Sequence, residues 1–259
     1  MRIIDSIALV GSSRFGLSNP YDCSIYAVDC GEGIVLIDTG GGLEPELVEA
    51  NMRQDGFDPD RIVMILVTHA HADHAGGCHW WKQRTGCQLA VPEGERAGIE
   101  GAQDIGPVLN VAKKAGIYPQ DYELKTVTVD IGLRDGQVLE VGHCRFHAIE
   151  VAGHSPHHTC YAVQVGGRRV LFSGDAVLYG GSLLLQNVAG CSLDDYRRDM
   201  PKLADLAIDS LLPGHGIFVV RNGQEHINRA IEYLTQLAVP PNFAVMCPKI
   251  IPAAYGKKT

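Results

Sequence analysis

Residues 68–77, THAHADHAGG, decide the fold of this chain. They follow residues 62–67, an apolar run rich in β-branched residues that predicts a buried strand. Because residues i and i+2 of an extended segment point to the same side, His69 and His71 can direct two imidazoles to one point. Asp73 and His74 come where the chain turns towards the glycines, so they can address a second point nearby. The pattern predicts a site for zinc or a similar ion, because these groups are costly to bury without a cation.

The composition is that of an ordinary globular protein, with 46% hydrophobic and 20% charged residues among 259. The formal net charge is −8 and no basic run is present, so nucleic-acid binding is not expected. No apolar run approaches the length of a membrane span, and residues 1–10 lack the design of a signal peptide. The eight cysteines are scattered without a Cys-x-x-Cys pair, which favours reduced thiols. We therefore expect a cytoplasmic protein that acts on a small molecule, with its oligomeric state left open.

Periodicity and turn residues predict the elements along the chain. Strands are expected over residues 1–10 (an edge strand), 23–29, 34–38, 62–67, 88–91, 124–130, 137–141, 145–151, 160–165, 169–172 and 211–212. Helices are expected over residues 43–55, 78–84, 108–115, 192–207 and 225–237. Strands come first and strand–helix alternation follows, which indicates a mixed sheet covered by helices.

One segment, residues 92–122, is less regular than the rest and is rich in glycine and charge. Segments of this length and composition are surface excursions or lids over a site. We interpret it as a lid insertion within a single domain that spans residues 1–259.

The event seen at residues 68–74 recurs along the chain. A strand ends, a glycine or a tight turn follows, and an ionisable side chain is presented: His154 after residues 145–151, Asp175 after residues 169–172, and His215 after residues 211–212. Ligands from the ends of separate strands make one site at one edge of a sheet.

These residues together resemble the metallo-β-lactamase superfamily over nearly the whole chain. The matching pieces are residues 68–77, Gly-His-Ser-Pro at 153–156, Ser-Gly-Asp at 173–175 and Pro-Gly-His-Gly at 213–216, with Asp-Thr-Gly at 38–40 as an early strand exit. The resemblance implies an α/β fold, an αββα sandwich in which two mixed β-sheets lie face to face and are flanked by helices. It also implies a dinuclear metal site at one edge.

Carried over by position, the resemblance implies a first metal held by His69, His71 and His154. It implies a second metal held by Asp73, His74 and His215, with Asp175 bridging the two. Imidazole and carboxylate ligands suit two divalent ions, zinc first, with iron or manganese as alternatives.

The branch of the family follows from single positions. An acidic residue at Asp175 is typical of the glyoxalase II-like and lactonase-like branches, whereas β-lactamases lack this carboxylate, so β-lactam hydrolysis is a minor alternative. The flavodiiron branch has a glutamate where this chain has His71, so that branch is disfavoured. Persulfide dioxygenases, which use one iron, share much of the motif set and are the oxidoreductase alternative. The third class of function considered is a metal-binding module without catalysis.

The implied activity is hydrolysis of an ester, lactone or thioester by a hydroxide that bridges the two metals. Asp73, through an oxygen left free by its metal, is expected to orient this hydroxide and pass a proton on. His158 is a candidate for orienting ligands, and Tyr179 for donating to a developing oxyanion. Residues 183–185, three leucines, hint at an acyl-containing substrate, although such a run is also a core pattern.

Overall fold

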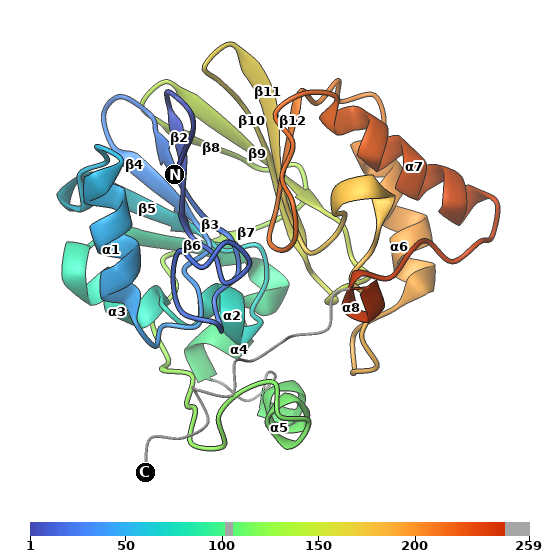
Figure 1. The fold of residues 1–259 in the computed structure, drawn as a ribbon, viewed down its shortest axis with the longest axis horizontal. Helices are drawn as coiled ribbons and strands as arrows, with labels where there is room; N and C mark the ends of the chain where they lie inside the picture. Colours follow the sequence, from blue (N-terminus) through green and yellow to red (C-terminus); the bar gives the residue numbers. More distant parts are fainter. Residues whose placement is uncertain (102–105, 247–259) are drawn as a thin grey trace.

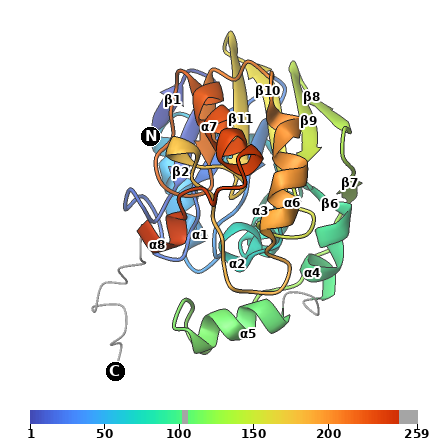
Figure 2. The same cartoon turned by 90° about the vertical axis from the view of Figure 1, so that its right-hand side faces the viewer.

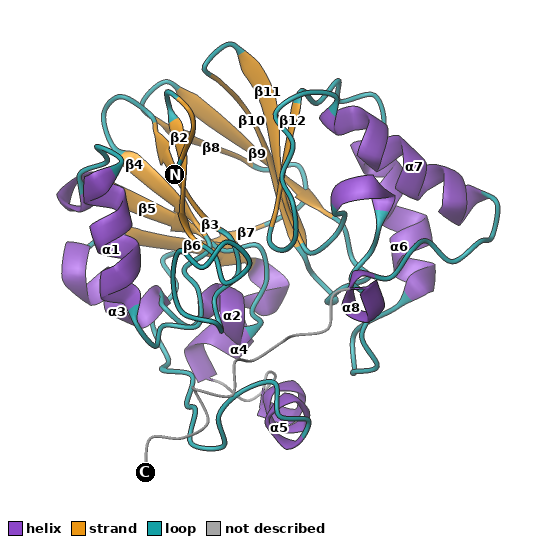
Figure 3. Cartoon of the chain, viewed as in Figure 1, coloured by secondary structure: helices purple, strands orange, loops and turns teal. Residues whose placement is uncertain are grey.

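The computed structural model describes residues 1–101 and 106–246, which form two β-sheets packed face to face (Figure 1, Figure 3). Among these residues, the first sheet has seven strands in chain order: β1 (Arg2–Ile4), β2 (Ile7–Gly11), β3 (Ile25–Asp29), β4 (Ile34–Ile37), β5 (Ile62–Leu66), β6 (Gln88–Pro92) and β7 (Ile131–Leu133). The second sheet has five within the same ranges, in the order β12 (Ser210–Pro213), β11 (Arg168–Gly174), β10 (Thr159–Val165), β9 (Cys144–Glu150) and β8 (Val138–Val141).

Both sheets are mixed, as expected. The pairs from β1 to β4 are antiparallel and those from β4 to β7 are parallel. In the second sheet β11 and β12 are parallel, whereas the other pairs are antiparallel. The predicted α/β sandwich of two mixed sheets is therefore confirmed.

Helices cover the outer faces of the sandwich. The first sheet is covered by α1 (Pro45–Gln54), α3 (Cys78–Thr85) and α4 (Arg96–Gly101), and the second by α6 (Leu193–Asp199) and α7 (Gly223–Thr235). Figure 2 shows α6 and α7 in front of the second sheet. The other helices, α2 (Ala72–Ala75), α5 (Gly106–Lys114) and α8 (Phe243–Met246), lie towards one end, with α5 at the bottom of both views (Figure 1, Figure 2). Single turns of 3₁₀ helix complete the elements: η1 (Pro59–Arg61), η2 (Glu93–Glu95), η3 (Tyr179–Gly181) and η4 (Met200–Leu203).

Strand alternation builds the core in layers. In β2, Ile7 and Leu9 pack between the two sheets, whereas Ala8 and Val10 pack towards the helices of the first sheet. Because both faces are covered, the strand reads as a continuous apolar run. None of the helices in the described ranges combines the length and the apolar character that crossing a membrane requires. The seven cysteines described are free thiols, as expected; Cys247 lies outside the described residues.

Two expected strands are wrong. Residues 1–10 form a hairpin, in which Ile4 pairs with Ile7, so that β1 is the edge and β2 is internal. Residues 124–130 form no strand; β7 begins only at Ile131. Their apolar side chains pack in the helix layer of the first sheet, and Lys82 Nζ donates to the Thr128 carbonyl at 2.7 Å. The alternation of apolar residues at 124–130 therefore reflects burial of their side chains and not pairing with another strand.

Two helix expectations also change. The helix expected to reach residue 207 is α6, which ends at Asp199 and continues only as the turn η4 to Leu203. Pro201 has no N–H to donate, so the α-helical ladder stops there. The segment 92–122 contains α4 as well as the expected helix, α5; residues 102–105 lie outside the described residues.

Candidate metal centre

Strand ends from both sheets meet at one end of the sandwich. The loop after β5 carries His69 and His71 and leads into α2. From the second sheet, His154 follows β9, Asp175 directly follows β11 and His215 follows β12. The centre therefore lies across the junction of the two sheets rather than at the edge of one.

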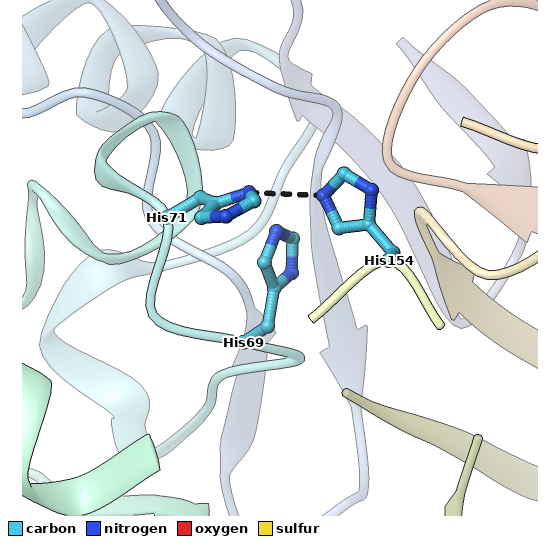
Figure 4. A group of neighbouring side chains, drawn as sticks. All are labelled: His69, His71 and His154. Carbon is cyan, nitrogen blue, oxygen red and sulfur yellow. Dashed lines mark hydrogen bonds between the residues drawn. The ribbon is translucent and has the colours of Figure 1, made fainter. Parts of the chain in front are cut away.

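The first group of side chains is His69, His71 and His154. One nitrogen of each ring lies within 4.8 Å of the others, and His154 Nε2 is 2.9 Å from His71 Nδ1. Figure 4 shows the three imidazoles pointing towards one another. His69 is fully buried, and its Nε2 has no hydrogen-bond partner.

The second group is Asp73, His74 and His215. Asp73 Oδ2 lies 3.2 Å from His215 Nε2, which lies 3.4 Å from His74 Nε2. Asp175 stands between the two groups: its Oδ2 is 3.3 Å from His154 Nε2 and 3.4 Å from His215 Nε2. All seven side chains expected as ligands are thus brought together.

The donor set fits metal ions, because some of its buried atoms lack a hydrogen-bond partner. Two of its atoms, His69 Nε2 and Asp175 Oδ1, are buried without a hydrogen-bond partner, which is costly unless a cation binds them. Burial lowers the pKa of His69 well below its usual range and that of His154 to about 4. Both imidazoles are therefore neutral, the form that coordinates a metal.

The second group attracts positive charge. Burial opposes protonation of His215, but the carboxylates of Asp175 and Asp73 outweigh it and raise the pKa of His215 to about 9. Burial likewise opposes ionisation of Asp175, but His215, His74 and His154 hold the pKa of its carboxyl well below the usual range. Without a metal, protons supply the charge that these carboxylates attract, and a divalent ion would replace them.

Asp38 orients the second group from behind. Its carboxylate accepts hydrogen bonds from the Thr68 backbone N–H at 2.8 Å, from the Thr68 hydroxyl at 3.0 Å, and from His74 Nδ1–H at 2.9 Å. With its proton on Nδ1, His74 presents Nε2 to the centre. The sequence marks Asp38 only as a strand exit, and this role was not predicted.

Two other contacts fix ligand orientation. His154 Nδ1–H donates to the Leu184 carbonyl at 2.8 Å, which leaves its Nε2 for the centre. The Tyr118 hydroxyl donates to Asp73 Oδ1 at 2.7 Å and accepts from the Asp73 N–H at 3.1 Å. Tyr118 belongs to the segment 92–122, and it occupies the Asp73 oxygen that was expected to be free.

The remaining two candidates have different positions. His158 is buried behind Asp175, and its Nε2 accepts the Asp175 N–H at 3.0 Å, which suits it to position that residue. Tyr179 is 51% exposed on η3, and its ring packs against His226 of α7 with the centroids 4.7 Å apart. The structure thus places Tyr179 at the surface beside α7, and this contact gives no support to a role in the reaction.

A cavity of about 360 Å³ adjoins the centre on the side of His71. It lies between the segment 92–122, the ligand loops and the loop before α6. Most of its lining residues are small or apolar: Ala70, Gly94, Gly98, Val108, Pro156, Ala189 and Gly190. The polar lining residues are His71, Glu95, Ser155 and His157.

Comparison with known proteins identifies the class that this fold and centre define. Residues 18–215 match the family model of the metallo-beta-lactamase superfamily, and the chain belongs to that family. The resemblance read from the sequence is therefore confirmed.

Two curated relatives are named as thioesterases. The chain is 28% identical over 210 residues to the acyl-coenzyme A thioesterase MBLAC2 of Bos taurus, covering 74% of this chain and 72% of that protein. It is 28% identical over 209 residues to the atrochrysone carboxyl ACP thioesterase of Aspergillus fumigatus, covering 80% of this chain. The match spans only about half, 54%, of that second relative.

Solved structures share the fold. BJP-1, a subclass B3 metallo-β-lactamase of Bradyrhizobium japonicum, matches with a TM-score of 0.70 and 26% identity, covering 92% of this chain and 91% of that one. A metallo-β-lactamase family protein of Thermus thermophilus matches with a TM-score of 0.70 and 20% identity, covering 91% and 81%. The second likeness shows the fold alone.

Proposed function

We propose that this protein is a metal-dependent hydrolase that cleaves acyl thioesters at a centre of two divalent cations, with residues 1–259 acting as one domain. Membership of the superfamily and two relatives named as thioesterases identify it as a hydrolase. The observation that carries the metal centre is the pair of buried donor groups joined by Asp175, in which His69 Nε2 and Asp175 Oδ1 have no hydrogen-bond partner. Zinc is the first choice for this donor set, and iron and manganese are the alternatives.

The roles of the residues follow from their contacts. His69, His71 and His154 would hold one ion, Asp73, His74 and His215 the other, and Asp175 would contact both. Bound ions of this kind polarise a carbonyl group and lower the pKa of water.

The rest of the protein keeps this donor set in place. Asp38 fixes the ring of His74, Tyr118 holds Asp73, and His158 holds the backbone at Asp175. The geometry is thus built before a substrate binds, which limits reorganisation during the reaction.

The cavity beside His71 supports an acyl substrate. Most of its lining residues are small or apolar, which suits an alkyl chain, and Glu95 and His157 also line it. The leucines at 183–185 give no support for an acyl substrate, because Leu183 and Leu184 are buried and Leu183 belongs to the core behind the second sheet.

A substrate panel with metal analysis tests the proposal. The purified protein should contain about two equivalents of transition metal, lose activity to a chelator and cleave acyl-coenzyme A at equal rates with and without oxygen. Protein that contains no metal after preparation without chelator would overturn the centre. Oxygen consumption with a glutathione persulfide would identify the iron dioxygenase alternative. Cleavage confined to lactones, other esters or β-lactams would show that thioesters are not the substrates. Bound metal without turnover of any substrate would show a metal-binding module without catalysis.

Narrowing the cavity tests where the acyl chain binds. Ala189 is exposed and lines the cavity, so Ala189→Phe should fill part of it without disturbing the core. We expect KM to rise several-fold for long acyl chains and to change little for acetyl thioesters, because uniform binding is lost. A nearby exposed residue gives the matched control, Asn187→Phe. Equal profiles for the two variants would place the acyl chain elsewhere.

A further inference from the structure

Glu95, on the turn η2 directly after β6, contacts both loops that carry the first group of ligands. Its Oε2 accepts the Ala70 backbone N–H at 3.3 Å. Its Oε1 accepts the Ser155 hydroxyl at 2.6 Å and the His157 backbone N–H at 3.3 Å. One carboxylate therefore joins two segments that are 85 residues apart in the sequence, at Ala70 and Ser155.

The positions of these contacts relate Glu95 to metal binding. Ala70 stands between His69 and His71, on the loop that follows β5 of the first sheet. Ser155 follows His154 directly, on the loop that follows β9 of the second sheet. The three imidazoles converge only while these two loops keep their relative position, and Glu95 accepts a hydrogen bond from each.

We infer that Glu95 is a positioning residue of the first metal group, an inference that rests on the metal centre of the proposed function. It forms no hydrogen bond or ion pair with the ligand imidazoles, but it accepts hydrogen bonds from the backbone beside them. The bond from the Ser155 hydroxyl, at 2.6 Å, has the length of a strong hydrogen bond to a carboxylate, and the two backbone bonds at 3.3 Å are longer. The negative charge also lies beside the proposed metal centre.

The chain offers a matched control on the same turn. Glu93 is exposed, and its Oε2 pairs with Arg96 Nε at 3.4 Å. The contacts found for its carboxylate do not involve the ligand loops. Glu93→Ala therefore removes the same charge from the same turn while leaving both loops held.

The test measures Co²⁺ binding by its absorption bands, in protein that carries His215→Ala. In this background the first group keeps its full set of donors and the second loses an imidazole, so the tighter Co²⁺ binding is expected at the first group. We expect Glu95→Ala to weaken Co²⁺ binding about tenfold relative to Glu93→Ala and to change the absorption bands, as the loss of an outer partner of a ligand does. Glu95→Gln should lose less, because its single amide oxygen can serve one loop while its NH₂ faces a donor of the other.

Thermal unfolding without metal separates this role from general stability. Glu95→Ala and Glu93→Ala should differ far less in metal-free Tm than in Co²⁺ affinity. Equal Co²⁺ affinity and equal spectra in the two variants would overturn the role of Glu95 and leave the proposed function standing. If Glu95→Ala does not fold, unchanged binding by Glu95→Gln overturns it equally. Unmutated protein that takes up no Co²⁺ would overturn the proposed function, and the role of Glu95 with it.

Discussion

Replacing Tyr118 by phenylalanine tests how the segment 92–122 supports the metal centre. The Tyr118 hydroxyl donates to Asp73 Oδ1 and accepts the Asp73 N–H. Burial, reinforced by the charge of Asp73, raises the pKa of Tyr118 well above its usual range, so the phenol remains a proton donor at any ordinary pH. Phenylalanine keeps the ring, which stacks between Tyr21 and Tyr122 with centroids 6.0 and 5.2 Å away, and removes both hydrogen bonds.

The magnitude follows from these two bonds. A hydrogen bond to a charged group contributes about 1.5–3 kcal/mol, and a buried donor left without an acceptor costs about 1–3 kcal/mol. Because Asp73 is 8% exposed, water compensates only part of the loss. We expect the free energy of unfolding to fall by about 3 kcal/mol in the metal-free protein.

Urea unfolding of the metal-free protein measures this change. Tyr21→Phe is the matched control, since Tyr21 belongs to the same aromatic cluster and its hydroxyl forms no hydrogen bond seen among the described residues. That variant should change the free energy of unfolding by less than about 0.5 kcal/mol. If Tyr118→Phe is no less stable than Tyr21→Phe, the bonds to Asp73 do not hold the segment to the centre.

Two further predictions concern the ligands and the pH dependence of folding. Asp175→Ala should lower metal content below two equivalents and abolish most turnover, because this carboxylate lies between both groups; elemental analysis that finds both ions retained would contradict its bridging role. Burial raises the pKa of Asp22 from 3.8 to about 6, so the folded state binds this proton more tightly than the unfolded state. The resulting stabilisation is present below about pH 4 and is lost as pH rises through 6, so metal-free protein should lose up to about 3 kcal/mol across this window relative to Asp22→Asn. Parallel stability profiles for the two proteins would exclude this contribution.

The ligand set could be predicted from the sequence because each ligand is tied to a local pattern. A β-branched run followed by a turn places His69 and His71 on one side of a strand exit, whatever the rest of the chain does. The family resemblance then supplied the order of His154, Asp175 and His215. The sheets largely fix Asp175 and His215, which lie within two residues of a strand end, whereas His154 lies four residues past β9 and depends on its loop.

The support of the ligands could not be predicted, because it depends on contacts between distant segments. Tyr118 meets Asp73 across 45 residues, and Glu95 meets Ser155 across 60. No periodicity or turn signal in residues 92–122 marks which tyrosine or glutamate turns inward. The false strand at 124–130 has a related cause, since alternating burial looks the same whether an extended segment pairs with a strand or lies under helices.

The placement of the centre across both sheets has a consequence for assembly. Residues 1–133 supply His69, His71, Asp73 and His74, whereas His154, Asp175 and His215 follow strands of the second sheet, later in the chain. Neither portion of the chain contains all the ligands of either metal group. Two polypeptides produced by dividing the chain between β7 and β8 would therefore each lack a full site. Metal uptake by the mixture would report their reassociation, because each bound ion would be held by ligands from both polypeptides.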